Sequence, residues 1–292
     1  MDALYINYHW TESAQDVILT ITRQYYDSHF LTDCFIPHVH SMVELLLVCD
    51  GRLDVSLNDD STILEPGDIL ICSPFDKHSG RLADGTDEAY YYCMIFDLAA
   101  FFAHILPPDD ADRLHAIISG SARFCSVIRA GEPEAAFIHR QIPYLQWLSN
   151  RYGSRCRARF HAAAFSLVCE LLEGCYEDGG VARNRNFDFI RDVHAYVSAH
   201  YREQMSTASI CEALSYSKSY FCRRFRESFG ANFSDYLCRW RVERAAELRG
   251  QPGLTLTDIA AQCGFPDYAW FSQSFRKYKQ TTPRRYFSMV EQ

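Results

Sequence analysis

No part of the sequence has about 18 consecutive apolar residues, and no basic segment leads into an apolar one near its start. These absences argue against a membrane-spanning helix, which needs about 20 such residues, and against a secretory signal peptide. The 12 cysteines are scattered and include no C-x-x-C pair, so zinc-finger spacing and a disulfide framework are both lacking. We therefore expect a soluble, cytoplasmic protein whose cysteines are reduced and mostly buried.

The chain also lacks an overall positive charge, since its formal net charge is −8. That charge is unevenly distributed. Residues 188–292 contain 15 Lys and Arg against 11 Asp and Glu, whereas the rest of the chain contains 14 against 26. A length of 292 residues predicts about two domains. The modest basic surplus makes the carboxyl-terminal part the candidate for a nucleic-acid partner.

Matching residues recur 50 positions apart in the last third of the chain. A repeat of this quality indicates two copies of one supersecondary unit. In the second copy, Ile259 and Cys263 share a helical face, Gly264 allows a sharp turn, and an apolar helix face follows. Each copy therefore predicts a helix-turn-helix, and residues 233–249, free of Pro and Gly, predict a joining helix. The matching pairs are Phe221 and Phe271, Phe225 and Phe275, Arg226 and Arg276, and Tyr236 and Tyr286.

Residues 259–277 carry the pattern I-A-x-x-x-G-F-x-D-x-x-x-F-x-x-x-F-R-K, and residues 282–286 carry T-P-x-x-Y. At these motifs the chain, from about residue 188 to 290, resembles the DNA-binding domain of AraC/XylS-type transcriptional regulators. The departures are small: Gln280 stands where the family usually has a helix-ending Gly, and Phe233 stands where Pro is common. The turn of the first copy, at Ser215, also lacks a Gly.

The resemblance and the polar helix faces together indicate which side chains face DNA. Arg223 suits bidentate pairing with guanine and Gln273 suits adenine, whereas Lys277 is better placed for phosphate. The alternative for any one side chain is an ordinary solvated surface position. The expected DNA-binding residues are Ser217, Lys218, Ser219, Cys222 and Arg223 in the first copy and Tyr268, Ala269, Ser272, Gln273 and Lys277 in the second.

From about residue 34 to 96, short apolar runs alternate with turn residues such as Asp50-Gly51 and Pro66-Gly67. This texture predicts an antiparallel β-barrel or sandwich. Apolar stripes then predict helices over residues 134–152 and 157–176, and a linker composition follows. We expect domains at residues 1–176 and 188–292, with a linker over 177–187.

The spacing H-x-H-x3-E-x6-G, from His38 to Gly51, resembles the first motif of the cupin superfamily. A looser second motif contains Gly67, Pro74 and His78, but Leu82 replaces its Asn. Because strand side chains alternate, we expect His38, His40 and Glu44 on one face, pointing into the barrel.

Three roles are open for His38, His40, Glu44 and His78. They could contact an organic effector, bind Zn, Mn, Fe or Ni, or be purely structural. We favour effector contact, with Tyr92 of the run Tyr90-Tyr91-Tyr92 added to the site, and we expect no cofactor. The metal remains the less favoured alternative for the same four residues.

The expected fold is α+β multidomain: a cupin-like antiparallel β-barrel with following helices, then an all-α domain of two helix-turn-helix units joined by a long helix. The resemblance implies a one-component transcriptional regulator, not an enzyme. Its implied partners are promoter DNA, a small effector such as a sugar or related catabolite, a second copy of the chain, and RNA polymerase. The alternatives are a metal-dependent cupin enzyme and a dimeric regulator without effector.

Overall fold

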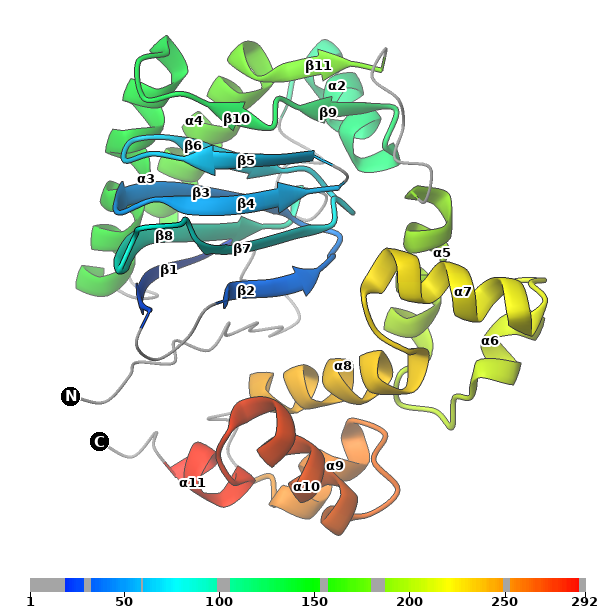
Figure 1. Cartoon of the computed structure of the whole chain (residues 1–292). Helices are drawn as coiled ribbons and strands as arrows, with labels where there is room; N and C mark the ends of the chain where they lie inside the picture. Colours follow the sequence, from blue (N-terminus) through cyan, green and yellow to red (C-terminus); the bar gives the residue numbers. More distant parts are fainter. Residues whose placement is uncertain are drawn as a thin grey trace. The chain divides into compact units, whose positions relative to one another are not determined.

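The computed structural model describes residues 19–28, 33–58, 60–98, 106–152, 157–179, 187–248 and 253–288. These residues divide into two compact units, one reaching Phe187 and the other starting at Asp188 (Figure 1). Among the described residues, no helix combines the length and apolar character that crossing a membrane requires.

The first unit is built on two antiparallel sheets. The five-stranded sheet has the order β1 (Leu19–Asp27), β8 (Glu88–Phe96), β3 (Val43–Asp50), β6 (Ile69–Cys72) and β10 (Val127–Ile128). The four-stranded sheet has the order β2 (Asp33–His38), β7 (His78–Leu82), β4 (Leu53–Leu57) and β5 (Asp60–Leu64). The chain crosses between the sheets after β2 and after β3, so Gly51 (φ 74°) marks a crossover.

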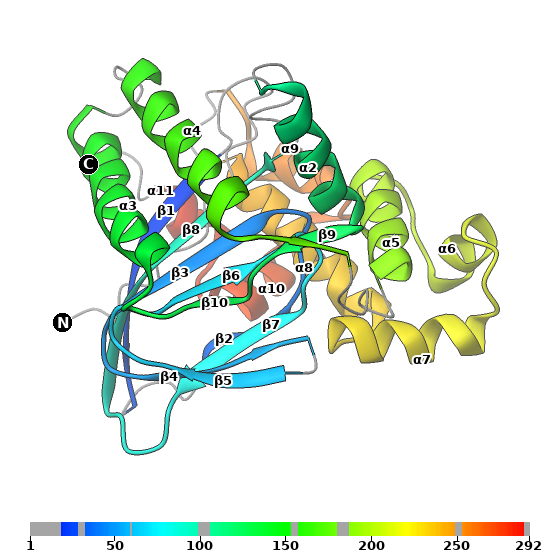
Figure 2. The ribbon, with the colours of Figure 1, turned by 90° about the horizontal axis from the view of Figure 1, so that it is seen from above.

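Helices cover one face of the five-stranded sheet. They are α2 (Pro108–Ser119), α3 (Pro133–Tyr152) and α4 (Arg157–Gly174), and Figure 2 shows α3 and α4 side by side. Alternate strand residues such as Val43, Leu45 and Met94 pack with Ile138 and Leu171 in one apolar core. Because successive strand side chains point to opposite faces, the residues between them point away from these helices.

Asp68 ties the turn before β6 to the segment after β10. Its buried carboxylate accepts hydrogen bonds from the Glu65 and Ala130 N–H groups, both at 3.0 Å, and from Arg129 Nη1 at 2.6 Å. Burial alone would raise the pKa of Asp68, but these donors hold it below its ordinary value. The ionised carboxylate is therefore part of the folded scaffold.

The sequence-based boundaries after α4 need correction. Tyr176, expected in the helix, starts β11 (Tyr176–Asp178), which also takes Glu177 and Asp178 from the expected linker. β11 pairs with β9 (Ala122–Phe124), and this backbone ladder is a long-range pairing that local composition does not encode. Residues 180–186 of the expected linker lie outside the described residues.

The second unit is helical. Its elements are α5 (Phe187–His200), α6 (Thr207–Ala213), α7 (Lys218–Phe229), α8 (Phe233–Glu247), α9 (Leu256–Gln262), α10 (Tyr268–Lys279) and α11 (Pro283–Ser288). Side-chain oxygens cap the amino ends of several helices, so their first N–H groups are satisfied locally. These N-cap residues are Ser206, Ser217, Asn232, Thr255 and Asp267.

Both helix-turn-helix turns pass through left-handed backbone. Gly264 (φ 80°) does so after α9, and Ser215 (φ 57°) does so after α6, which shows how the first turn forms without Gly. The two positions are 49 apart whereas α7 and α10 start 50 apart, so the second turn is one residue longer. At the end of α10, Gln280 adopts the left-handed backbone conformation (φ 54°) for which the family usually has Gly. Its Nε2 also donates to the Lys277 carbonyl at 3.0 Å.

Gly264 also lies against the backbone of another segment. A Cβ at this position would be 2.5 Å from the Tyr201 carbonyl oxygen and 2.9 Å from Arg202 Cα. That carbonyl accepts a hydrogen bond from Nε of buried Arg241 on α8 at 2.8 Å. Arg241 Nη2 donates further to the Glu203 carbonyl at 2.6 Å, so α8, the second turn and the segment after α5 are joined at one point.

Candidate functional site

Three imidazoles and one carboxylate meet where the two sheets of the first unit come together. His38 ends β2 and is paired with His78 of β7, while Glu44 lies in β3 of the other sheet. His40 lies in the connection between β2 and β3. The prediction that one strand carries His38, His40 and Glu44 is therefore wrong, because the chain bends at residues 41–42 and changes sheet. The four predicted residues nevertheless converge.

The imidazole Nε2 atoms surround a single oxygen. Glu44 Oε2 lies 3.0 Å from His40 Nε2, 3.2 Å from His78 Nε2 and 3.9 Å from His38 Nε2. Backbone carbonyl groups orient two of the rings through their other nitrogen. Nδ1 of His40 lies 3.1 Å from the Met42 carbonyl oxygen, and Nδ1 of His78 lies 2.8 Å from the Asp76 carbonyl oxygen. A carbonyl only accepts hydrogen bonds, so each of these Nδ1 atoms carries a proton.

The electrostatics of the cluster favour a charged pair in spite of burial. Burial would raise the pKa of Glu44, but His78 and the contacts from His40 hold it well below its ordinary value. Burial would lower the pKa of His78, but Cys72 and Glu44 hold it well above its ordinary value. Burial raises the pKa of Cys72 itself to about 11, so its thiol is protonated near neutral pH and Glu44 is the decisive charge.

Aromatic side chains border the cluster. The Phe35 ring lies edge-on to His38 at 6.2 Å between centroids, and its contact with β7 depends on Gly80, whose Cβ would meet the ring at 2.4 Å. Tyr91 lies 6.4 Å from Phe35 and is stacked on Tyr26 at 5.9 Å. The cluster therefore has an apolar, aromatic side.

The prediction that Tyr92 belongs to the effector site needs correction, because the tyrosine that borders the cluster is Tyr91. Cys93, the next residue, directs its thiol to Glu44 Oε1 at 3.3 Å, so the side chain of Tyr92 points to the opposite face. There Tyr92 packs against the core between the sheet and the helices. The sequence could not choose among three consecutive tyrosines, because the choice depends on strand register.

The residues expected to face DNA lie on α7 and α10 or at the N-cap of α7. All are exposed except half-buried Ser272, while Phe221, Phe225, Phe271 and Phe275 hold the opposite faces in the core. Lys277 is already engaged within the unit, since its Nζ donates to Asp235 Oδ1 of α8 at 2.8 Å.

Sequence reasoning missed two exposed aromatic residues on these helices. Tyr220 on α7 is 38% exposed and Trp270 on α10 is 41% exposed. They are 50 positions apart, so the repeat register could have identified them as equivalent positions beside the polar face.

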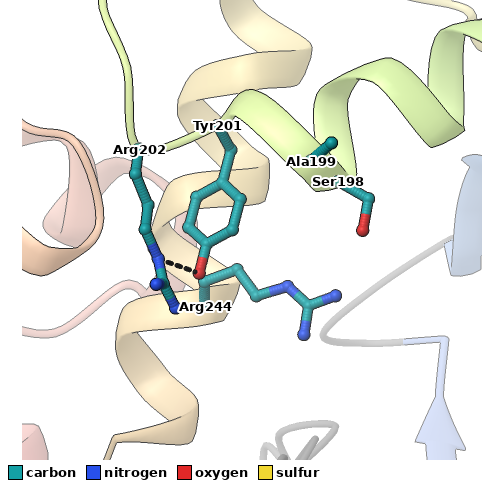
Figure 3. A pocket seen from close by; sticks show the side chains of 5 residues that line it. All are labelled: Ser198, Ala199, Tyr201, Arg202 and Arg244. Atoms are coloured by element: carbon teal, nitrogen blue, oxygen red, sulfur yellow. Dashed lines mark hydrogen bonds between the residues drawn. The ribbon is translucent and has the colours of Figure 1, made fainter.

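A cavity of about 230 Å³ lies between the end of α5 and α8, lined by Ser198, Ala199, Tyr201, Arg202 and Arg244 (Figure 3). Arg202 Nε donates to the Tyr201 hydroxyl at 3.0 Å, and the Arg244 guanidinium lies over the Trp240 ring. Both guanidinium groups are thus engaged by neighbours, and the cavity belongs to the scaffold that joins α5 to α8.

Two family models match the chain. Residues 23–164 match the AraC-like ligand binding domain, and residues 210–289 match a helix-turn-helix domain. The chain belongs to the AraC-type transcriptional regulators. This membership confirms a ligand-binding domain followed by a helix-turn-helix DNA-binding domain.

Relatives of this AraC-type chain agree with the assignment. A Staphylococcus aureus (strain MSSA476) HTH-type transcriptional regulator is 33% identical over 101 residues, which are 35% of this chain and 14% of the relative. The Escherichia coli HTH-type transcriptional regulator YijO is 28% identical over 129 residues, or 44% of each chain. The match thus spans less than half the length of either relative.

A solved structure confirms the fold. ToxT from Vibrio cholerae, bound to an unsaturated fatty acid, matches with a TM-score of 0.54 and 12% identity, covering 95% of this chain and 97% of ToxT. At that identity the likeness concerns the fold alone.

Proposed function

We propose that this AraC-type regulator reads a specific promoter sequence through α7 and α10, and that a small effector in the first unit changes this binding. The observation that carries the proposal is the matched pair of N-capped helices, each with an apolar buried face and a polar exposed face. Helices of this kind enter the major groove with their amino-terminal residues on base edges. Two such helices on one unit would contact successive major grooves, about 34 Å apart.

Individual side chains supply the sequence information. Arg223 of α7 is exposed and suits guanine, and Gln273 of α10 is exposed and suits adenine. Ser217, Lys218, Ser219 and Cys222 would accompany Arg223, and Tyr268, Ala269 and Ser272 would accompany Gln273. Lys277 would have to exchange Asp235 for a phosphate, so we propose a positioning role for it.

The effector site that we propose lies beside the histidine–glutamate cluster. His38 is the most accessible member, with 21% of its side chain exposed, whereas the side chains of His40, Glu44 and His78 are less exposed. Imidazoles next to the rings of Phe35 and Tyr91 combine hydrogen-bonding groups with an aromatic surface. That combination suits a hydroxyl-bearing molecule with an apolar face, such as a sugar or a related catabolite.

We also propose that the regulator acts as a homodimer through α3. Tyr144 and Trp147 are 42% and 49% exposed on α3, and their rings are stacked at 6.0 Å between centroids. Large exposed aromatic side chains are enriched at protein interfaces. RNA polymerase is a further partner that this role would require.

The test selects bound duplexes from a random DNA library and then repeats the binding measurement across a panel of sugars and small organic acids. We expect one enriched sequence motif and a change in affinity with one class of compound. An enriched motif without any response would favour the dimeric regulator that has no effector. Failure to enrich any motif would contradict the proposed sequence-specific reading.

A further inference from the structure

Two cysteines lie opposite each other at the end of the β9–β11 ladder. β9 and β11 are antiparallel, with Phe124 opposite Tyr176 (Figure 1). The same register places Cys125 opposite Cys175, and the Cys125 N–H donates to the Cys175 carbonyl oxygen at 2.7 Å. Opposite residues of an antiparallel pair carry their side chains on one face, and the Cα atoms of a hydrogen-bonded pair lie about 5.5 Å apart. That separation falls within the commonest range for a disulfide, about 5.5–6 Å.

The thiols of this pair already contact each other. The Cys175 thiol donates a hydrogen bond to the Cys125 sulfur, and neither sulfur is in a disulfide. Cys175 is 2% exposed, whereas Cys125 is half-buried and accessible to a small molecule from solvent. A disulfide between them would therefore need no large movement of the backbone.

The contact gives the two thiols different reactivity. The hydrogen bond from Cys175 lowers the pKa of the Cys125 thiol below its ordinary value, against the effects of burial and of the Glu177 carboxylate. The same hydrogen bond, together with burial, raises the pKa of Cys175. Because a thiolate is the form that attacks an oxidant, Cys125 is the nucleophile and Cys175 remains a thiol. Cysteines that sense oxidants are characteristically accessible, low in pKa and adjacent to a second, resolving cysteine.

We propose that Cys125 and Cys175 form a reversible disulfide when the protein meets hydrogen peroxide. The Cys125 thiolate attacks one peroxide oxygen, the O–O bond breaks, and the leaving hydroxide takes up the proton that Cys125 had released, forming water. Cys125 is thereby oxidised to a sulfenic acid. The Cys175 sulfur then attacks the Cys125 sulfur, the S–O bond breaks, and the hydroxyl leaves with the Cys175 proton as a second water. The two thiols together lose two electrons, which reduce one peroxide to two waters, and a small thiol reductant would restore both thiols.

The bridge would act on the last strand of the first unit. It would fix the amino end of β11 and close the segment of residues 125–175, which includes α3 and α4. A cross-link that closes a long segment stabilises a fold mainly by restricting the unfolded chain. Oxidation is therefore expected to stabilise the first unit. This effect is independent of the proposed DNA reading and of the effector.

The experiment uses the full chain, reduced and then freed of reductant. The folded protein is treated with a small molar excess of hydrogen peroxide, alkylated, digested without reductant and analysed by peptide mass spectrometry. A parallel sample contains a dione reagent that traps sulfenic acids. The variants are Cys125→Ser and Cys175→Ser, and the serine hydroxyl of the second can still donate to Cys125. Cys49→Ser on β3 is the matched control, because the Cys49 thiol is exposed but donates to the Leu47 carbonyl and not to another thiol.

In the unaltered protein and in Cys49→Ser, we expect a peptide pair that joins Cys125 to Cys175, lighter than the two thiol peptides by two hydrogen atoms. Dithiothreitol should reverse it. Cys175→Ser should accumulate the trapped sulfenic acid at Cys125, whereas Cys125→Ser should give no sulfenic acid at Cys175. Oxidation should raise the melting temperature of the unaltered protein by about 4 °C or more, with no such rise in Cys125→Ser.

The proposal is overturned if peroxide oxidises exposed Cys49 while Cys125 and Cys175 remain free thiols, or if they are joined only after denaturation. A sulfenic acid trapped at Cys175 would contradict the assigned order of attack. A fall in melting temperature on forming the bridge would contradict its fit to the folded ladder. If Cys175→Ser, at the buried position, does not fold, the unaltered protein and Cys125→Ser decide the matter.

Discussion

Replacing Gly264 by Ala should destabilise the helical unit by about 1–4.5 kcal/mol. The left-handed backbone at φ 80° costs a residue with a Cβ about 1–2 kcal/mol. The new Cβ would also lie 2.5 Å from the Tyr201 carbonyl oxygen, and relieving such overpacking costs about 1–3 kcal/mol. The reduced freedom of the unfolded chain returns about 0.4–1 kcal/mol. The carbonyl cannot retreat cheaply, because Arg241 donates to it.

Gly253 provides the matched control. It is also left-handed, at φ 85°, but nothing lies within 4 Å of a Cβ built there. Gly253→Ala therefore isolates the backbone strain, and the difference between the variants isolates the contact, expected at about 1–3 kcal/mol. Both free energies are measured by urea unfolding of the full chain, followed by far-UV circular dichroism. Equal losses of unfolding free energy in the two variants would contradict a close contact between the second turn and the Tyr201 carbonyl.

Three further outcomes are expected. Arg223→Ala should weaken binding to the selected DNA by about 1–3 kcal/mol and binding to random DNA much less, as measured by fluorescence anisotropy; equal losses would remove its base-reading role. Asp68→Asn should cost about 1–3 kcal/mol of unfolding free energy at neutral pH. Because the pKa of Asp68 is lowered on folding, this contribution is complete above its unfolded-state value, near 4, and is lost as the pH falls through the folded value; a penalty that persists in acid would contradict this. Trp147→Asp should shift the chain towards monomer in sedimentation equilibrium, and an unchanged mass would point to a surface other than α3.

The helical unit could be largely predicted because its signals are local. The caps Ser206 and Ser217, the phenylalanines spaced four apart and the repeat register all act within one or two turns of helix. The backbone conformation of residues at the turns was harder to predict. Ser215 and Gln280 adopt left-handed backbone that the sequence alone does not demand of them, because the surrounding helices impose it.

The first unit was predicted less completely because its pairings are long-range. The residues of the cluster were found, but not their distribution over two sheets, since nothing local specifies that the chain changes sheet between His38 and Glu44. The choice of Tyr91 over Tyr92 depends on the register between β3 and β8, which pairs residues about 45 positions apart. β11 was missed for the same reason.

The uninterrupted helix α8 connects α7 to the second helix-turn-helix, so its length sets the spacing of α7 and α10, the two helices that we propose to read DNA. A single inserted or deleted residue in α8 would rotate everything after it by about 100° and advance it by about 1.5 Å. Arg241, locked to the carbonyls of Tyr201 and Glu203, would prevent the helix from absorbing that change by slipping. If α7 and α10 read DNA as proposed, an insertion or deletion in α8 would therefore change the distance between the two DNA segments that they contact abruptly, not gradually. Under the same proposal, substitutions on the exposed faces of α7 and α10 would be the more accessible route to a new DNA specificity.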